Sequence, residues 1–322
     1  MATIKDVAKE AGVSIATVSY VLNNSPRISS STKRKVNDAI EKLNYVPNLA
    51  AQGLKNQVLP LIIIVLNSFS GPIYQEIVDI MVKRFNDNGL SVLISTGEDS
   101  FNFIKTHPVS GAIILDTSVK MSEKQSIANC GTIIASRRHF YLGDKSYPIN
   151  YIDGFEPFKE ITKLAINEGY KDLMYVHGAF DSIDEKERCL GFLSALKEKS
   201  ISPLAMLDGN FTEKSGYDAI KNYIQNGGKL PEVIFSANDE MAIGIIHYLN
   251  EKEELVPNKV KVIGYDNIEL SKYLGLTTIN NNRNEWASYI TEQIIKVIND
   301  KKEVENLDVF ESKFEIIRRN TF

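Results

Sequence analysis

The sequence contains few of the residues on which secreted or metal-dependent proteins rely. Its two cysteines, Cys130 and Cys189, lie far apart without metal-binding spacing around them, so we expect buried, reduced thiols in a cytosolic protein. The four histidines are scattered along the chain and form no recognisable ligand set. The composition therefore predicts no disulfide, no metal site and no cofactor.

Segments that would carry the chain into or across a membrane are also missing. The first ten residues, MATIKDVAKE, are charged and lack the apolar core of a signal peptide. The longest apolar run, LPLIIIVL at residues 59–66, is far too short to span a bilayer. We therefore expect a cytoplasmic protein without membrane contact.

Common catalytic signatures are absent as well. The chain has no G-x-S-x-G nucleophile elbow, no Gly-Lys-Ser/Thr phosphate loop and no H-E-x-x-H zinc motif. These absences argue against a hydrolase or a kinase, and we expect a protein that is not an enzyme.

The charge of the chain is unevenly distributed. The 322 residues carry a net charge of −4, and their 43% hydrophobic and 24% charged content is that of an ordinary globular protein. Residues 1–57 contain eight lysines and arginines against four acidic residues, which leaves +4 on this head and −8 on the remainder. A basic head on an acidic body predicts that only the head meets a polyanion.

The head has the pattern of a helix-turn-helix unit. The apolar residues of IKDVAKEA recur at helical spacing, Gly12 can take the positive φ that ends a helix, and Ser14 is a good N-cap for a second helix. In that second helix Val18, Val21 and Leu22 share one face. A polar loop and a third amphipathic helix, STKRKVNDAIEKLNY, follow.

The opposite face of the second helix carries short polar and exposed apolar side chains. Ser14, Thr17 and Ser19 suit contacts to phosphates, whereas Ile15, Ala16 and Tyr20 suit contacts to base edges in the major groove. The alternative is a small three-helix bundle with an ordinary solvated face.

The segment PNLAAQGLKNQ, residues 47–57, is rich in helix formers but spans only about two turns. A helix of this length is marginal alone in water. It is either a linker or a conditional helix that folds on DNA, with Leu54 as its one large apolar residue.

The stretch TIKDVAKEAGVSIATVSYVLN, followed by VPNLAAQGL, closely resembles the head of the LacI/GalR family of bacterial transcription regulators. The resemblance implies a helix-turn-helix domain at 1–46, a hinge helix at 47–58 and an effector-binding and dimerisation core at 59–322. It also implies these DNA-binding candidates: Thr3, Ser14, Ile15, Ala16, Thr17, Ser19, Tyr20, Asn23, Arg27, Ser29, Thr32, Tyr45, Asn48, Ala51, Leu54 and Lys55.

The body alternates short apolar runs with amphipathic stretches, as in a parallel sheet covered by helices on both faces. The expected strands are 61–66, 90–96, 111–116, 131–136, 172–178, 233–239 and 260–266, and the expected helices include 72–88, 157–169, 186–199, 214–227 and 239–251. The predicted fold is an all-α head plus an α/β core of two doubly wound parallel-sheet subdomains.

The resemblance makes this core periplasmic-binding-protein-like and divides it by a crossover near its end. The helix at 285–300 is expected to return to the first subdomain, and FESKFEIIRRNTF is expected to close the second. The expected subdomains are then 59–153 plus 283–306, and 154–282 plus 307–322.

Ligands of such folds bind at the carboxyl ends of the strands. The resemblance places Arg188 of EKERCLGF and Asp266 of VIGYDN there, while Asp239 is expected to cap a helix instead. In IIASRR, Ser136 replaces the aspartate that relatives often carry. The effector-binding candidates are Ser70, Tyr74, Ser136, Arg137, Arg188, Phe211, Asn238 and Asp266.

The resemblance implies a homodimeric regulator, most simply a repressor, that binds double-stranded operator DNA with its hinge helices in the minor groove. Arginine, carboxylate, amide and aromatic side chains suit a sugar-like effector in the cleft. One alternative is control by a protein partner in place of a small ligand. Another is a stand-alone sugar-binding protein, against which the basic head and the missing signal peptide argue. Induction and co-repression both stay open.

Overall fold

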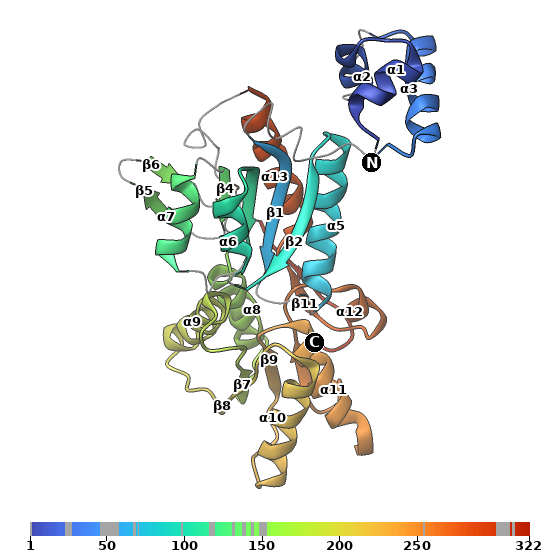
Figure 1. Ribbon diagram of the computed structural model, residues 1–322. Helices are drawn as coiled ribbons and strands as arrows, with labels where there is room; N and C mark the ends of the chain where they lie inside the picture. Colours follow the sequence, from blue (N-terminus) through green and yellow to red (C-terminus); the bar gives the residue numbers. More distant parts are fainter. Residues whose placement is uncertain are drawn as a thin grey trace.

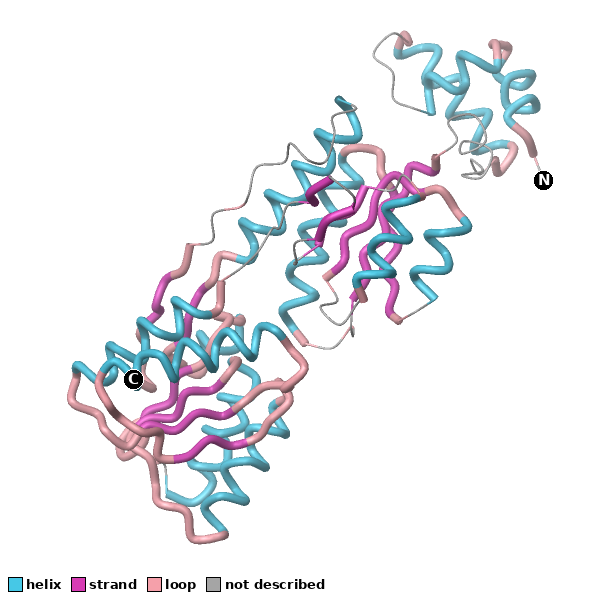
Figure 2. The backbone as a smooth tube through the Cα atoms, turned by 90° about the vertical axis from the view of Figure 1, so that its left-hand side faces the viewer, coloured by secondary structure: helices cyan, strands magenta, loops and turns pink. Residues whose placement is uncertain are grey.

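The computed structural model shows a small helical head and a longer α/β body with two sheets (Figures 1 and 2). None of the helices in the described part of the chain is long and apolar enough to cross a membrane. The described residues are 2–22, 28–45, 58–66, 69, 71–97, 99–115, 120–130, 133–136, 140–142, 145–147, 153–253, 255–300, 310 and 313–322.

The head consists of three helices, α1 (Ile4–Ala11), α2 (Ile15–Leu22) and α3 (Ser30–Lys42). Gly12 ends α1 with a φ of 65°, and the Ser14 hydroxyl accepts the Thr17 amide proton at 3.1 Å to start α2. Val7, Val18 and Val36, one from each helix, are fully buried and pack together. The predicted helix-turn-helix head is confirmed.

The first sheet of the body is parallel, in the order β2-β1-β3-β4. Its strands are β1 (Leu59–Leu66), β2 (Ser91–Thr96), β3 (Val109–Ile114) and β4 (Ile133–Ser136). Its helices are α5 (Pro72–Asp87), α6 (Asp99–Thr106), α7 (Met121–Asn129) and α13 (Arg283–Asp300).

Alternation along β1 explains why this strand is a continuous apolar run. Ile62 and Ile64 belong to the core cluster shared with α5 and α13, whereas Ile63 and Val65 belong to the cluster shared with α6 and α7. Successive side chains of a strand point to opposite faces, so a strand covered on both faces needs apolar residues at every position.

The second sheet is also parallel, in the order β10-β9-β7-β8. Its strands are β7 (Leu173–Val176), β8 (Ala205–Leu207), β9 (Val233–Ser236) and β10 (Lys261–Ile263). Its helices are α8 (Phe155–Asn167), α9 (Ile183–Glu198), α10 (Glu213–Gln225), α11 (Asp239–Glu253) and the short α12 (Glu269–Tyr273). Helix α8 packs on α9 and α10 packs on α11, and helices cover both faces of the sheet (Figure 2).

The chain crosses between the two sheets near its end, as the resemblance to the LacI/GalR family implied. Trp286 and Ile290 of α13 are buried in the first sheet's core with α5. Strands β11 (Thr278–Asn280) and β12 (Glu315–Ile317) pair antiparallel, and Phe322 packs into the core of the second sheet. The two-subdomain α/β core is therefore confirmed.

Five short strands in the described part of the chain were not predicted from the sequence. They are the edge strand β8, the antiparallel hairpin of β5 (Phe140–Leu142) and β6 (Lys145–Tyr147), and the antiparallel pair of β11 and β12. Each spans three residues, which is too short for hydrophobic alternation to appear in a sequence window.

Candidate functional site

Helix α2 presents the exposed face that the sequence predicted. The aliphatic side chain of Ile15 is 44% exposed and the aromatic side chain of Tyr20 is 49% exposed. Val18, on the other side of the helix, is fully buried. The hydroxyls of Ser14 and Thr17 lie 2.9 Å apart at the start of the helix. The exposed face of α2 therefore combines an aromatic side chain, an aliphatic side chain and hydroxyls.

Other DNA-binding candidates lie at the starts of the neighbouring helices. Thr3 caps α1 in a reciprocal capping box with Asp6, and Ser29 caps α3 with its hydroxyl 2.9 Å from that of Thr32. Helix N-termini attract anions such as phosphates. Tyr45 is partly buried against the head core. The candidates Asn23, Arg27, Asn48, Ala51, Leu54 and Lys55 lie outside the described residues.

In the body, Arg188 and Asp266 come together at the carboxyl ends of the second sheet's strands. Arg188 projects from α9, and its Nη2 lies 3.5 Å from Oδ1 of Asp266, which follows β10. Nη1 of Arg188 donates to the carbonyl oxygen of Ala237 at 2.6 Å. The guanidinium carbon lies 3.9 Å from the ring centre of Tyr265. Both charged side chains are buried, so the pair is an interior feature and not a surface ion pair.

The surroundings keep Arg188 in its charged form. Burial lowers its pKa, but the carboxylate of Asp266 more than offsets burial and raises that pKa above its usual value. Asp266 itself has a φ of 114°, a conformation that residues other than glycine rarely adopt. Backbone strain of this kind clusters at functional sites. The pair therefore has the burial, charge and strain expected of a binding site.

Phe211 and Asn238 belong to the same end of the sheet. The ring of Phe211 lies over Gly178, where an added Cβ would be only 2.2 Å from the ring. The amide of Asn238 donates to the Phe211 carbonyl at 2.9 Å and accepts the Met241 amide proton at 3.0 Å. Asn238 therefore both caps α11 and holds the Phe211 loop in place.

The expectation that Asp239 caps a helix is wrong, because Asn238 provides the cap. The Asp239 carboxylate turns inward, where it accepts the Ile268 amide proton at 3.0 Å and the Thr278 hydroxyl at 2.5 Å. Burial and the nearby charge of Asp266 raise the pKa of Asp239 to about 7. The buried carboxyl thus joins α11, the segment before α12, and β11.

The first sheet contributes less to the described part of the site. Tyr74 on α5 is half-buried against that sheet's core. Ser136 ends β4, while Ser70 and Arg137 lie outside the described residues.

Sequence reasoning missed Arg283, at the first position of α13. Arg283 is buried, donates to the backbone carbonyl of Asp266 and lies 2.9 Å from the Glu76 carboxylate of α5. It therefore connects the helix of one subdomain to the Asp266 segment of the other. No local signal marks this residue, because its two partners lie 17 and 207 residues away in the sequence.

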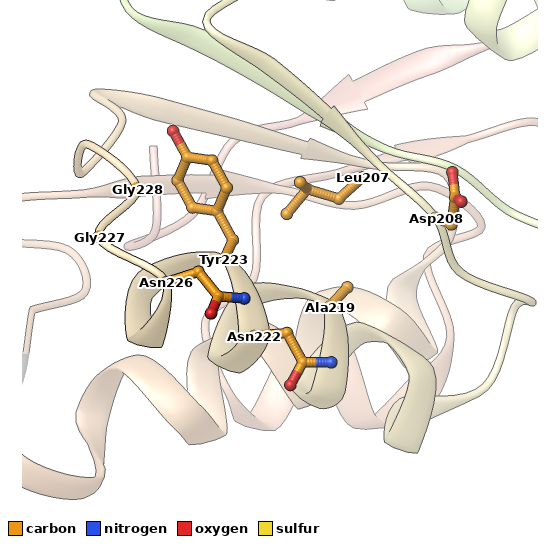
Figure 3. A pocket seen from close by; sticks show the side chains of 8 residues that line it. All are labelled: Leu207, Asp208, Ala219, Asn222, Tyr223, Asn226, Gly227 and Gly228. Atoms are coloured by element: carbon orange, nitrogen blue, oxygen red, sulfur yellow. The ribbon is translucent and has the colours of Figure 1, made fainter.

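A cavity of about 460 Å³ lies elsewhere, between β8, α10 and the turn at Gly227 and Gly228 (Figure 3). Neither Arg188 nor Asp266 lines it. This hollow is therefore distinct from the charged pair.

Two protein families match the chain. The family described as "Bacterial regulatory proteins, lacI family" matches residues 3–48, and the "Periplasmic binding protein-like domain" matches residues 162–322. The HTH-type transcriptional repressor PurR of Pasteurella multocida (strain Pm70) is 31% identical over 314 residues, which cover 94% of both chains. PurR of Histophilus somni (strain 2336) is 30% identical, with 96% of both chains covered.

Solved structures agree with this assignment. The Lac repressor dimer bound to operator and the anti-inducer ONPF has a TM-score of 0.79 at 25% identity, over 99% of this chain and 98% of that one. The CelR–cellobiose complex has a TM-score of 0.70 at 21% identity, covers both chains fully and shows a shared fold. The chain therefore belongs to the LacI family of bacterial regulatory proteins and is a DNA-binding transcriptional regulator of that family.

Proposed function

We propose that the protein is a transcriptional repressor whose affinity for operator DNA is set by a small, sugar-like ligand bound between its two α/β subdomains. The observation that carries this proposal is the buried Arg188–Asp266 pair at the carboxyl ends of the second sheet's strands. Desolvation offsets much of the attraction within a buried charged pair, so stability alone gives little reason for this pair and a binding role is favoured. The protein then acts in the cytoplasm, where its DNA lies.

DNA recognition is assigned to the exposed face of α2. Tyr20 and Ile15 read base edges, while the hydroxyls at the start of the helix contact phosphates. The 47–58 segment serves as the hinge, with Leu54 wedged into the minor groove.

The ligand is assigned by the side chains near the pair. Arg188 offers donors, Asp266 offers acceptors, and Phe211 offers one aromatic face. A pyranose ring has hydroxyls at its rim and one apolar face, which matches this combination. The CelR complex contains cellobiose but shares only the fold, whereas the relatives at 30–31% identity are PurR repressors, so a purine-type ligand is the competing class.

A homodimer is proposed for the operator-bound form. The exposed apolar side chains Leu270, Tyr273 and Leu274 gather on and after α12, with Tyr273 78% exposed. Apolar groups exposed together favour an interaction surface. The Lac repressor dimer on its operator supports a dimer on DNA for the family fold.

The two subdomains of the body are assigned as 59–153 plus 283–306 and 154–282 plus 307–322.

Coupling between ligand and operator then runs through the contact of the subdomains. The buried Arg283 ties the backbone of Asp266 to Glu76 of α5, so a ligand that moves Asp266 also shifts the first subdomain. Such coupling amounts to about 1–3 kcal/mol between the two sites.

The test begins with a thermal-shift screen of sugars, sugar phosphates and nucleobases on the full chain. An operator selected from random DNA is then titrated with and without the hit, at one fixed salt concentration, by fluorescence anisotropy. We expect a sugar to change operator affinity about 5–150-fold in the wild type. Arg188→Lys should abolish this change, and the exposed Lys186→Ala on the same helix should preserve it.

Other results would contradict the proposal. A nucleobase hit without any sugar hit makes the sugar assignment wrong. A normal ligand response in Arg188→Lys removes the pair from the binding site. If no small molecule changes operator affinity but a protein partner does, control by that partner replaces control by a ligand.

A further inference from the structure

Outside the Arg188–Asp266 pair, the fold brings together a histidine, a glutamate and a cysteine. His177 directly follows β7, and its Nδ1 lies 2.7 Å from Oε1 of Glu185. One ligand atom from each of His177, Glu185 and Cys189 lies within 4.8 Å of the other two.

The backbone sets this arrangement. Glu185 and Cys189 are four residues apart on α9, so their side chains lie one turn apart on the same helix face. The strand end brings His177 to that face from the preceding element. Two ligands at this spacing on one helix, with a third from a neighbouring element, form a common metal-binding geometry.

The glutamate is held rigidly by further hydrogen bonds. Its Oε2 accepts the Gly178 amide proton at 2.6 Å and the Tyr175 hydroxyl at 3.2 Å, and Glu185 is only 1% exposed. Supporting hydrogen bonds of this kind orient metal-binding carboxylates and increase affinity. Oε1 remains directed at the imidazole.

We propose that His177, Glu185 and Cys189 form a binding site for a zinc-like divalent transition metal ion. Thiolate, imidazole and carboxylate are the donors that zinc prefers, and three protein ligands leave a fourth position for water. Zinc bonds of about 2.0–2.3 Å place tetrahedral ligands about 3.3–3.6 Å apart. The three ligand atoms already lie within 4.8 Å of one another, so side-chain rotations alone can bring them to that spacing.

A metal ion here would affect the neighbouring charged pair. Arg188 lies between Glu185 and Cys189 on the same turn of α9, so the ion fixes the turn that carries the guanidinium. This proposal needs no assumption about the effector, and it is tested with metal alone.

The experiment uses the full-length chain without a histidine tag, reduced and freed of metal with a chelator. Cobalt is titrated first, since a thiolate ligand produces a charge-transfer absorption, and zinc is then titrated by calorimetry. The chain has only two cysteines, so Cys130→Ser leaves Cys189 as the single thiol and should retain binding of one ion. Cys189→Ser should lose the absorption and bind zinc more than about 100-fold more weakly, because loss of a supporting partner alone costs about 10–100-fold.

A matched control lies on α11. His247 and Glu251 are also four residues apart, with Nε2 and Oε1 3.8 Å apart, but form no such cluster with a cysteine among the described residues. His247→Gln should therefore leave zinc affinity unchanged, whereas His177→Gln should weaken it.

A measurement on the unaltered chain removes any dependence on the folding of the variants. Zinc should slow alkylation of Cys189, followed by mass spectrometry, while the exposed Cys130 reacts at the same rate with or without zinc. Equal alkylation of Cys189 in both conditions, or equal zinc affinity of Cys189→Ser and wild type, would overturn the proposal. The cluster would then be a hydrogen-bonded trio only.

Discussion

Replacing Arg188 by alanine tests whether the buried pair behaves as one unit. The change removes a hydrogen bond from a charged donor to the Ala237 carbonyl, a contact with the Tyr265 ring and the guanidinium beside Asp266. The carboxylate of Asp266, only 2% exposed, loses the guanidinium beside it in a poorly solvated place. The free energy of unfolding should fall for this reason.

The magnitude follows from that burial. A hydrogen bond to a charged group contributes about 1.5–3 kcal/mol, and breaking a buried ion pair costs about 3–5 kcal/mol. The two figures overlap, because both include the loss of the charged donor. We therefore expect Arg188→Ala to lower the free energy of unfolding by about 3–5 kcal/mol.

The assay is urea unfolding followed by far-UV circular dichroism and by tryptophan fluorescence. The single tryptophan, Trp286, is buried in the first sheet's core, so its signal reports that subdomain. Arg188 belongs to the second sheet's subdomain, and the circular dichroism midpoint should shift further than the fluorescence midpoint. Midpoint shifts convert to free energies through the denaturant slope of each transition.

A double-mutant cycle isolates the pair. Asp266→Asn removes the charge that Arg188→Ala leaves behind, so the double variant should be more stable than the sum of the single losses predicts, by about 1–3 kcal/mol. A loss below about 1 kcal/mol in Arg188→Ala, together with additive effects in the double variant, would refute the interior pairing.

Three further predictions concern the recognition helix, the helix packing and the buried carboxyl. Tyr20→Ala should weaken binding to the selected operator by about 1–3 kcal/mol and hardly affect random DNA, as anisotropy at fixed salt would measure, because the exposed ring reads bases. Gly191→Ala should lower the free energy of unfolding by about 1–3 kcal/mol in thermal unfolding, since its Cβ would lie 2.2 Å from the Phe155 carbonyl oxygen and force α8 and α9 apart. The pKa of Asp239, raised to about 7 from 3.8, makes the folded state bind more protons than the unfolded state between these values. Stability should therefore decline as the pH rises from about 4 to 7, by up to about 4 kcal/mol at about 1.4 kcal/mol per unit, and Asp239→Asn should flatten this slope in unfolding measured across that range.

Each of these predictions has its own control. Tyr20→Phe separates the contribution of the ring from that of the hydroxyl. If Tyr20→Ala loses the same affinity for operator and for random DNA, Tyr20 contacts only the DNA backbone. Lys186→Ala, at an exposed position of the same helix as Gly191, should leave the free energy of unfolding unchanged. If Gly191→Ala also leaves it unchanged, the close packing of α8 on α9 is contradicted. If the free energy of unfolding of Asp239→Asn still declines as the pH rises from about 4 to 7, another group causes the decline.

Much of the fold could be predicted from local patterns in the sequence. Helix α5 was expected at 72–88 and spans Pro72–Asp87, and the apolar run of β1 was recognised as a strand covered on both faces. The turn at Gly12 followed from its tolerance of positive φ, which the structure uses. These features were accessible because their causes lie within a few residues of one another.

The resemblance to relatives supplied Arg188, Phe211 and Asp266, but not what each side chain contacts. The helix cap at Asn238 in place of Asp239 shows the reason. Either residue type can cap a helix, and the Asp239 carboxylate turns inward to Ile268 and Thr278, which lie 29 and 39 residues further on.

Short-range reasoning likewise found no ligand set among the histidines and cysteines. His177 and Cys189 are twelve residues apart, and this spacing matches no metal-binding motif. The packing of α9 against the end of β7 brings both of them close to Glu185. Arg283 meets Glu76 across 207 residues in the same way. The sequence by itself determined the helices and the longer strands, because helical hydrogen bonds and apolar periodicity are local. Tertiary packing decided the three-residue strands and which charges meet, because strand pairing and burial join residues distant along the chain.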